Sequence, residues 1–476
     1  MKLSQLMAGV PGSWQDTEIA GLTCDSRRVE PGWAFVCLRG TASDGHDFAR
    51  KAAEKGAAVI LAERDTGTAV QCLLPDTHAV WPLLCANWFG HPADGLHLIG
   101  FTGTNGKTTS TFLTKHILEC AGHRVGLIGT IQNMVGDEVL PSDHTTPDAY
   151  ELQELFRQMA DRGCDCVVME VSSHALAQGR TAGLTFDVGV FTNLTQDHLD
   201  YHKTMENYMQ AKKRLFLQSR CAIVNRDDPW AEAMTQGITC PVYSFSLGDD
   251  RADYTARNVR QRPDGVDFEL LATGAIGRVR LKTPGLFSVY NAMGSAACAL
   301  ALGVPFDTVT AALSETAGVK GRAEVVPTGR DFTVVIDYAH TPDGLENICK
   351  TMRECCHGRL IVVFGCGGDR DRGKRPKMGA VAAKYADVAV VTSDNPRSEE
   401  PEAIIAEILT GMDGMTGEKQ VIPNRIEAIR WALSHSKAGD TVLLAGKGHE
   451  TYQILKDRTI HLDEREVVAD ALSPKA

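Results

Sequence analysis

One stretch near residue 100 constrains the fold of this chain more than any other. Residues 97–101 form an apolar run that predicts a buried strand, and residues 110–118 carry apolar side chains at helical spacing. Between them lies the run Gly103-Thr104-Asn105-Gly106-Lys107-Thr108-Thr109. A phosphate-binding loop typically consists of a strand, a glycine-rich turn, Gly-Lys-Thr and a helix, in this order. In such a loop, backbone N–H groups and the helix N-terminus bind an anion.

The residue types at the end of this loop indicate a nucleotide with Mg²⁺. We expect the Lys107 ammonium to reach the terminal phosphates and the Thr108 hydroxyl to bind the metal ion. The strict pattern G-x-x-x-x-G-K-[ST] is not met, because Phe101 stands where its first glycine belongs. The alternative is a turn that only joins a strand to a helix, which gives no reason for Lys-Thr-Thr at the helix start.

Composition argues against several other classes of protein. The net charge of −11 argues against binding to nucleic acid or to an anionic membrane surface. No apolar run reaches the roughly 18 residues of a membrane span, and the first residues lack the apolar core of a signal peptide. The 14 cysteines are scattered without a C-x-x-C pair, so we expect free thiols and a cytoplasmic protein.

The length of 476 residues predicts two to four domains, at about 100–200 residues per domain. Apolar runs alternate with helical patterns, which predicts α/β domains with mostly parallel, doubly wound sheets. We expect three such domains, at residues 1–95, 96–321 and 322–476. In the last of them, four apolar runs predict buried strands: 334–337, 360–364, 388–392 and 441–445.

Polar side chains follow the strands of the central domain, where ligands of doubly wound sheets gather. We expect these side chains to converge on one crevice: Lys107, Glu170, Ser172, His174, Asn193, Asp197 and His198. The Glu170 carboxylate and the His198 imidazole could hold Mg²⁺ against nucleotide phosphates. The alternatives are that Glu170 is only a satisfied acid at a strand end, and that His174 is a core histidine.

Four motifs, taken together, resemble the Mur ligases of peptidoglycan synthesis. They occur in the family's order and at long, matching intervals, which is far more specific than a phosphate loop alone. The motifs are Gly103 to Thr109, Glu170-Val171-Ser172-Ser173-His174, Asp197-His198-Leu199-Asp200-Tyr201-His202 and Tyr208-Met209-Gln210-Ala211-Lys212. The resemblance implies an N-terminal UDP-binding domain, a central ATPase domain and a C-terminal Rossmann-like domain, in agreement with the boundaries above.

The resemblance also implies a reaction. It is ATP-dependent and adds meso-2,6-diaminopimelate to the D-glutamate side-chain carboxylate of UDP-N-acetylmuramoyl-L-alanyl-D-glutamate through an acyl phosphate. The enzyme's part is then mostly positioning and charge neutralisation. We expect a monomer, with ATP as co-substrate and two Mg²⁺ ions.

Roles at the phosphate loop follow from the matching positions of the family. Lys107, Glu170, His198 and Lys212 match catalytic positions, and Thr108, Glu170, His198 and Lys212 match metal ligands. Lys212 matches a lysine that carries a carbamate, a modification that burial favours because CO₂ adds to the neutral amine. The alternative is that Lys212 belongs to a solvated basic helix face with Lys213 and Arg214. ATP-binding positions are matched by residues 103–109 and by Asn291, Arg322 and Asp337.

For the UDP-linked substrate, the resemblance indicates positions in two parts of the chain. Many relatives carry asparagine where this chain has His144. The residue types around positions 24 and 41–43 vary within the family, so we expect main-chain contacts there. The positions are Cys24, Ser26, Thr41, Ala42, Ser43, His144, Thr145, Thr146, Ser172, Gln178 and Arg180.

The run Asp394-Asn395-Pro396-Arg397 matches the family's diaminopimelate motif, and lysine-adding relatives lack its arginine. A planar guanidinium can bind the distal carboxylate of diaminopimelate with two hydrogen bonds. A lysine substrate lacks this carboxylate and would leave the guanidinium unpaired. We expect Arg370 to make a second contact and Glu450 to bind the distal ammonium, with Gly446 nearby. The alternative is that Asn-Pro only makes a turn. The nearby run Gly367-Gly368-Asp369-Arg370 lacks the G-x-G-x-x-G of a dinucleotide loop.

Three other functions compete with this interpretation. A lysine-adding Mur ligase or a folylpolyglutamate-type ligase is the nearest, and the Arg397 motif and the N-terminal domain argue against both. A phosphate-loop kinase or nucleotide switch would turn over ATP without needing an amine. A regulatory protein that has lost catalysis would not need the complete set Lys107, Glu170, His198 and Lys212.

Overall fold

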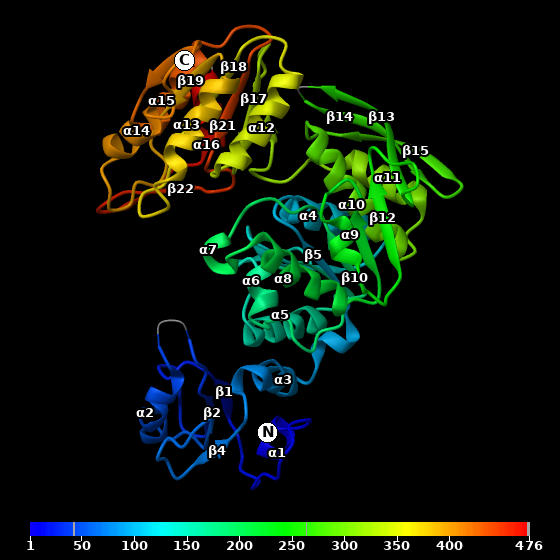
Figure 1. The fold of residues 1–476 in the computed structure, drawn as a ribbon, viewed down its shortest axis with the longest axis vertical. Coiled ribbons are helices and arrows are strands. Elements are labelled where there is room, and N and C mark those ends of the chain that lie inside the picture. The colour runs from blue at the N-terminus through cyan, green and yellow to red at the C-terminus, as the bar shows by residue number, and fades with distance from the viewer. Residues whose placement is uncertain (41–42, 263, 474–476) are drawn as a thin grey trace. The chain divides into compact units, whose positions relative to one another are not determined.

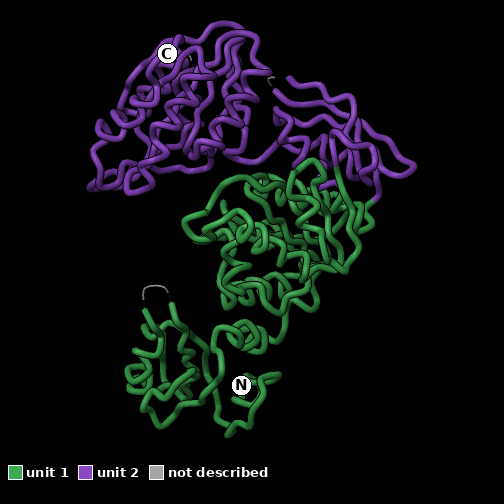
Figure 2. The backbone as a smooth tube through the Cα atoms, viewed as in Figure 1, with its two compact units in different colours: residues 1–245, 297–304 green, residues 246–296, 305–476 purple. Residues whose placement is uncertain are grey.

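Parallel strands with helices between them make up most of the chain, as the alternation of apolar runs predicts. The computed structural model describes residues 1–40, 43–262 and 264–473. The chain divides into two units, residues 1–245 with 297–304 and residues 246–296 with 305–476 (Figure 2). The predicted site residues Thr41 and Ala42 lie outside the described residues.

A small parallel sheet opens the first unit. Its strands follow the order β1-β2-β3-β4, and all neighbouring pairs are parallel. Three of the four runs were expected from their apolar residues, and β4 was not. The elements are α1 (Leu3–Leu6), β1 (Gly21–Thr23), β2 (Trp33–Val36), η1 (Gly45–Phe48), α2 (Ala49–Glu54), β3 (Val59–Ala62), β4 (Gln71–Leu73), α3 (Thr77–Phe89) and η2 (Pro92–Gly95).

A larger sheet carries the phosphate loop. In the first unit its strands follow the order β12-β11-β10-β5-β9-β6-β7-β8, and only the pairs β6–β7 and β7–β8 are antiparallel. Its elements are β5 (His97–Thr102), α4 (Lys107–Cys120), β6 (Val125–Ile128), β7 (Asn133–Val135), β8 (Glu138–Leu140), α5 (Ala149–Asp161), β9 (Cys166–Glu170), α6 (Ser173–Ala177), β10 (Val188–Phe191), α7 (Leu199–His202), α8 (Met205–Leu217), β11 (Ala222–Asn225), α9 (Ala231–Thr235) and β12 (Val242–Ser246).

A glycine in β5 allows α8 to approach the sheet closely. A Cβ atom at Gly100 would lie 2.9 Å from Leu215 Cδ1 and 3.0 Å from the ring of Phe186. Because only glycine fits there, the C-terminal part of α8 packs closely on β5, and Tyr208 and Lys212 of the same helix reach the phosphate loop.

The second unit contains an antiparallel ribbon and a six-stranded sheet. The ribbon pairs β13 with β14 and β14 with β15, and the sheet follows the order β16-β17-β21-β18-β19-β20, in which only β16 is antiparallel to its neighbour. The elements that follow β12 along the chain are β13 (Tyr254–Arg262), β14 (Gly265–Ala272), β15 (Ala275–Leu281), α10 (Leu286–Ala301), α11 (Phe306–Glu315), β16 (Glu324–Val326), β17 (Thr333–Asp337), α12 (Pro342–Cys355), β18 (Leu360–Phe364), α13 (Lys374–Tyr385), β19 (Val388–Val391), α14 (Pro401–Leu409), β20 (Glu418–Val421), α15 (Arg425–Ser434), β21 (Thr441–Ala445), β22 (Tyr452–Ile454), β23 (Thr459–His461) and α16 (Glu464–Leu472), of which α10 is divided between the two units.

Helices cover both faces of the six-stranded sheet (Figure 1). Side chains of α12, α13 and α14 form one apolar cluster with the sheet, and side chains of α15 and α16 form another. The central strands β18 and β21 are buried along their whole length, which is why their sequences are continuously apolar rather than alternating. The four strands predicted in this part of the chain are confirmed.

Two further expectations can be compared with the structure. All 14 cysteines lie among the described residues and are free thiols. Among the described residues, no helix is both long and apolar enough to cross a membrane.

Candidate functional site

The loop between β5 and α4 has the conformation that its glycines permit. Gly103 has φ +152° and Gly106 has φ +88°, and a Cβ atom at Gly103 would lie 1.9 Å from Thr192 Oγ1. The loop lies against the segment that follows β10, because Thr104 N donates to Asn193 O at 2.8 Å. Lys107 begins α4, and its ammonium donates to the carbonyls of Gly103 and Thr104, each at 2.9 Å. The lysine is therefore folded over a loop that ends at a helix N-terminus.

Glu170 is a buried carboxylate beside this loop. It ends β9, which pairs with β5, so that Phe101 faces Glu170 in the register. Its Oε1 accepts hydrogen bonds from Thr108 Oγ1 at 2.9 Å and from Thr130 N at 2.8 Å. The residue is only 1% exposed. Carboxylate and hydroxyl oxygens are the ligands that Mg²⁺ prefers, so the donor set of Thr108 and Glu170 fits this ion.

Two histidine rings lie side by side near the same strand ends. The centroids of His174 and His198 are 4.8 Å apart, and His198 takes a left-handed backbone conformation with φ +52° just before α7. Burial lowers the pKa of both imidazoles. The charge of His198 lowers the pKa of His174 further, and the charges of Lys212 and Lys107 lower that of His198, against the opposing carboxylate of Asp197. Both rings are therefore neutral near pH 7, which is the form that binds metal ions. His174 is brought to the site rather than into a separate core.

Lys212 is buried on α8 and points at the phosphate loop. It is 1% exposed, its Nζ donates to Gly103 O at 2.7 Å, and it lies 4.4 Å from the ring centroid of Tyr208. Burial lowers the pKa of its ammonium well below the usual value, and the charge of Lys107 lowers it further. The interpretation of Lys212 as part of a solvated face is wrong, because its side chain is removed from water.

Several residues matched to the UDP-linked substrate form a hydrogen-bonded chain that begins at Glu170. Thr146 Oγ1 donates to Glu170 O at 2.8 Å and accepts from Ser172 N at 3.0 Å. Arg180 Nη1 donates to Thr146 O at 2.7 Å, and Arg180 also donates twice to Gln178 Oε1. Thr145 joins the same chain through the hydroxyl of Thr130, at 3.0 Å between the oxygens. His144 is exposed beside them.

The remaining matched residues of the first unit lie in its small sheet. Cys24 follows β1 and is half-buried, and burial, with the nearby carboxylate of Asp148, raises the pKa of its thiol to about 11. The Ser26 carbonyl accepts a hydrogen bond from Lys55 Nζ at 2.9 Å, and Ser43 is exposed. These residues offer a neutral thiol, hydroxyls and main-chain groups.

In the second unit, Asp337 and Arg322 lie close together. Asp337 ends β17, and its carboxylate accepts from Ala323 N at 2.7 Å and from Ala339 N at 2.8 Å. Burial raises the pKa of this carboxyl, against the opposing charge of Arg322. The Arg322 guanidinium lies 4.9 Å from the ring centroid of Tyr338. Asn291 is buried on α10.

Tyr338 and His449 belong to this cluster and were not singled out from the sequence. Their ring centroids are 4.9 Å apart. Tyr338 directly follows β17, and His449 lies in the short loop after β21. Their positions after strand ends were the only feature of the sequence that could have indicated a role in the site.

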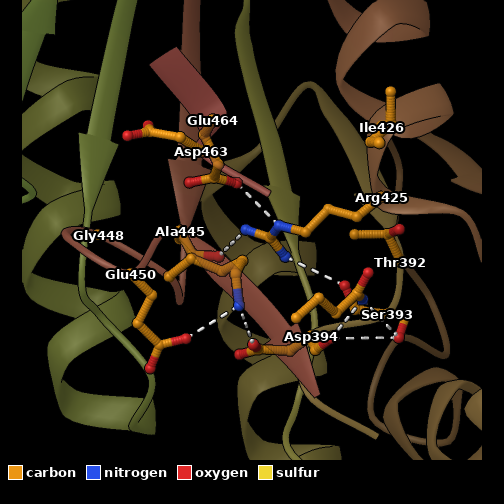
Figure 3. A network of polar contacts seen from close by, with 12 residues as sticks. Thr392, Ser393, Asp394, Arg425, Ile426, Ala445, Gly448, Glu450, Asp463 and Glu464 are labelled. Atoms are coloured by element: carbon orange, nitrogen blue, oxygen red, sulfur yellow. Dashed lines mark hydrogen bonds and ion pairs between the residues drawn. The ribbon is translucent and has the colours of Figure 1, made fainter. Parts of the chain in front are cut away.

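The loops after β19 and β21 meet around Asn395. Figure 3 shows Asp394 from the first loop and Glu450 from the second. Asn395 Nδ2 donates to Glu450 Oε2 at 2.9 Å, and Asn395 Oδ1 accepts from Lys447 Nζ at 3.1 Å. Asp394 is buried beside them, with its Oδ1 at 3.6 Å from Lys447 Nζ. A Cβ atom at Gly446 would lie 3.1 Å from Asp394 Oδ2. The predicted residues Asp394, Asn395, Gly446 and Glu450 are thus brought together, and Lys447 was missed.

Arg397 and Arg370 approach each other across a glycine. Arg397 has φ +52°, and its Nη1 donates to Gly368 O at 2.9 Å. A Cβ atom at Gly367 would lie 3.0 Å from Arg397 Nη1 and 3.7 Å from Arg370 Cγ, and one at Gly368 would lie 1.9 Å from Pro396 O. The two glycines therefore allow their loop to lie in close contact with the loop of Pro396 and Arg397. This close packing explains why two consecutive glycines occur in a run that is not a dinucleotide loop.

Buried arginines hold these loops in place. Arg425 Nε donates to Glu464 Oε1 at 2.8 Å, Nη2 donates to Ala445 O at 2.8 Å, and Nη1 donates to Ser393 O at 3.3 Å (Figure 3). Arg375 donates to both carboxylate oxygens of Glu399 and to Gly367 O. Neither arginine was singled out from the sequence, because each partner is distant along the chain.

Three family models match the chain. The model of the Mur ligase family catalytic domain matches residues 18–79, the Mur ligase middle domain matches residues 101–299, and the Mur ligase glutamate ligase domain matches residues 321–448.

Full-length relatives and solved structures agree with these matches. The UDP-N-acetylmuramoyl-L-alanyl-D-glutamate–2,6-diaminopimelate ligase of Syntrophomonas wolfei subsp. wolfei is 48% identical over 100% of both chains, and that of Geobacillus thermodenitrificans is 44% identical over 100% of both. A solved structure of an enzyme with the same name has a TM-score of 0.75 at 32% identity, and covers 99% of this chain and 98% of its own. The MurF ligase of Thermotoga maritima in complex with ADP has a TM-score of 0.63 at 19% identity, covers 96% of this chain and 98% of its own, and supports the fold alone.

Proposed function

Because the chain belongs to the Mur ligase family, we propose that it is an ATP-dependent amide ligase of peptidoglycan precursor synthesis. Its substrates are UDP-N-acetylmuramoyl-L-alanyl-D-glutamate and meso-2,6-diaminopimelate, the two compounds in the name shared by its full-length relatives. The observation that carries the proposal is the meeting of three groups at one loop. Thr108 bonds the buried Glu170, and the buried Lys212 bonds the carbonyl of Gly103.

The reaction proceeds in two displacements. An oxygen of the D-glutamate side-chain carboxylate attacks the γ-phosphorus of ATP, and ADP leaves. The amine of diaminopimelate then attacks the acyl carbon, the bond from carbon to the phosphate oxygen breaks, and the amine loses a proton. Phosphate therefore leaves with one oxygen of the original carboxylate. The loop residues Gly103 to Thr109 bind the phosphates, and Lys107 neutralises charge there.

Mg²⁺, when bound, screens the phosphate charges against the attacking carboxylate. Thr108, Glu170 and His198 would hold it, because they supply a hydroxyl, a buried carboxylate and a neutral imidazole near the loop. Lys212 would contribute as a carbamate. Its lowered pKa leaves a neutral amine, which adds to CO₂ with loss of one proton and gives an anionic oxygen ligand.

The nucleotide and the UDP-linked substrate are assigned to the remaining clusters. Asn291, Arg322 and Asp337 serve the nucleotide. Cys24, Ser26 and residues 41–43 bind the UDP end, and the hydrogen-bonded chain from Thr145 to Arg180, with His144 exposed beside it, binds the peptide end. We infer that the enzyme works in the cytoplasm, and a monomer remains our prediction.

The amino-acid pocket accounts for the choice of diaminopimelate. Arg397 and Arg370 lie against Gly367 and offer two guanidinium groups to the distal carboxylate, whereas Glu450 offers a carboxylate to the distal ammonium. Lysine would leave Arg397 without its partner, and a site built around a charged group strongly rejects an analogue that lacks it.

An isotope-transfer experiment tests this mechanism. The D-glutamate side-chain carboxylate of the UDP-linked substrate is labelled with ¹⁸O, and the phosphate released with ATP, Mg²⁺ and diaminopimelate is analysed by mass spectrometry. We expect one ¹⁸O atom in each phosphate formed from a doubly labelled carboxylate. Phosphate without the label would contradict an acyl phosphate and favour simple hydrolysis of ATP.

A further inference from the structure

Lys447 is a charged side chain that the proposed reaction does not use, yet it is fully buried in the amino-acid pocket. Its exposed fraction is 0%, and its Nζ lies 2.9 Å from Glu450 Oε2, 3.1 Å from Asn395 Oδ1 and 3.6 Å from Asp394 Oδ1. Removing an ammonium from water is costly unless it is paired. Here the ammonium donates two hydrogen bonds, to Glu450 Oε2 and Asn395 Oδ1, and the Asp394 carboxylate adds an ion pair.

We propose that Lys447 is a positioning residue that turns the Glu450 carboxylate toward the distal ammonium of the incoming amino acid. This inference rests on the proposed function, because it assigns a role within that substrate pocket. It concerns the recognition of the ligand's second amine, which Lys447 controls without touching the ligand.

The hydrogen bonds of Glu450 explain how this positioning works. Its Oε2 accepts from both Lys447 Nζ and Asn395 Nδ2, each at 2.9 Å. No hydrogen bond to Oε1 is seen among the residues that the structure describes. With Oε2 held by two donors, Oε1 is the oxygen left to accept from a ligand ammonium.

Asn395 is locked by the same contact. Its Oδ1 accepts from Lys447 Nζ and from Ile454 N, the latter at 2.9 Å. These two donors fix which end of the amide is the oxygen, and therefore which end donates to Glu450. Without Lys447, Asn395 Oδ1 would keep only the hydrogen bond from Ile454 N. The carboxylates of Glu450 and Asp394 would also lose the positive charge that both of them contact.

The backbone around Lys447 is built for this contact. Gly446 has φ +114° and Gly448 has φ +55°, and a Cβ atom at Gly448 would lie 2.6 Å from Tyr338 Cβ. Two glycines in the left-handed region allow the loop to turn inward and present the lysine between them. Arg425 binds Ala445 O just before this loop and Ser393 O just before the opposing one, so both sides of the contact are fixed.

The test compares two amines that differ by one group. Diaminopimelate and 2-aminopimelate share both carboxylates, but the second lacks the distal amine. The ratio of their kcat/KM values is measured for the wild type and for Lys447→Met, together with KM for ATP. We expect Lys447→Met to lower the ratio at least ten-fold by raising KM for diaminopimelate, with KM for ATP changed less than two-fold.

A matched variant and a milder one serve as controls. Lys456 is an exposed lysine of the same unit that pairs with Glu400, so Lys456→Met should leave the ratio unchanged. Lys447→Gln keeps a hydrogen-bond donor and is the alternative where the methionine variant does not fold.

The outcomes separate this inference from the proposed function. If the wild type forms no amide with diaminopimelate, the proposed function fails. If the wild type works and Lys447→Met slows both amines equally, the positioning role of Lys447 is overturned and only a structural role is left. Failure of both Lys447 variants to fold would also assign the residue to stability and overturn the inference.

Discussion

Loss of the Arg425 guanidinium should destabilise the second unit strongly, because it would leave a buried carboxylate without its partner. The side chains of Arg425 and Glu464 are both 0% exposed and are joined at 2.8 Å. Removal of one member of a buried ion pair costs about 3–5 kcal/mol. Arg425→Met also deprives the carbonyls of Ser393 and Ala445 of a donor, although Glu464 keeps a favourable position in the first turn of α16. We therefore expect the free energy of unfolding to fall by about 4 kcal/mol.

Replacement of both charged residues should be much less damaging. Apolar side chains of similar size often replace a buried ion pair with little loss, since neither charge then has to be removed from water. The double variant Arg425→Met/Glu464→Leu should therefore be at least about 2 kcal/mol more stable than the single variant. The exposed Arg458 provides a control, and Arg458→Met should change stability by less than about 0.5 kcal/mol.

Trp431 provides a local readout for this experiment. It is the only tryptophan of the second unit and lies on α15, the helix that begins at Arg425. The full chain is labelled with 5-fluorotryptophan, and the ¹⁹F resonance of Trp431 is followed through a urea titration after its assignment with Trp431→Phe. A loss below about 1 kcal/mol for Arg425→Met, or a double variant no more stable than the single one, would mean that the buried ion pair does not stabilise the second unit.

Three further predictions concern catalysis, specificity and pH. Lys212→Ala should nearly abolish amide formation because the carbamate is lost, and a short carboxylic acid should restore part of it; activity near that of the wild type would contradict the carbamate. Arg397→Lys should raise KM for diaminopimelate at least ten-fold more than KM for ATP, as a guanidinium pair is worth about 1.5–3 kcal/mol, and equal effects on both would mean that Arg397 does not bind the carboxylate. Burial lowers the pKa of His449 to about 4, below its usual value near 6.5, so the unfolded state binds more protons between these values. The stability that neutral His449 contributes is therefore fully present above about pH 6.5 and is lost as the pH falls toward 4. His449→Gln should flatten this pH dependence of the free energy of unfolding in the Trp431 titration, and an unchanged slope would contradict the role of His449.

The sequence predicts the parts of the molecule that depend on consecutive residues. The phosphate loop and the buried strands of the six-stranded sheet follow from local runs of glycine or of apolar residues. The strands β13 to β15 were missed, although Asp264-Gly265 between alternating runs is a usual hairpin signal.

The missed residues of the site depend on contacts between distant parts of the chain. Arg425 and Glu464 are 39 positions apart, and Lys447 and Asn395 are 52 positions apart. No periodicity connects such pairs, and each arginine or lysine alone is typical of a solvated surface. Only the fold shows that these charges are buried. The same holds for Lys212, whose sequence context suits a solvated helix face and whose burial is a property of the packing of α8 on β5.

The most direct test of the account is the dependence of phosphate release on the amine. Purified protein is given ATP, Mg²⁺ and UDP-N-acetylmuramoyl-L-alanyl-D-glutamate, with meso-diaminopimelate, with L-lysine or with no amine, and released phosphate is measured over time. We expect rapid release with diaminopimelate and only a background rate in the other two reactions. Equal release with lysine would contradict the role of Arg397, and equal release without any amine would contradict the ligase itself.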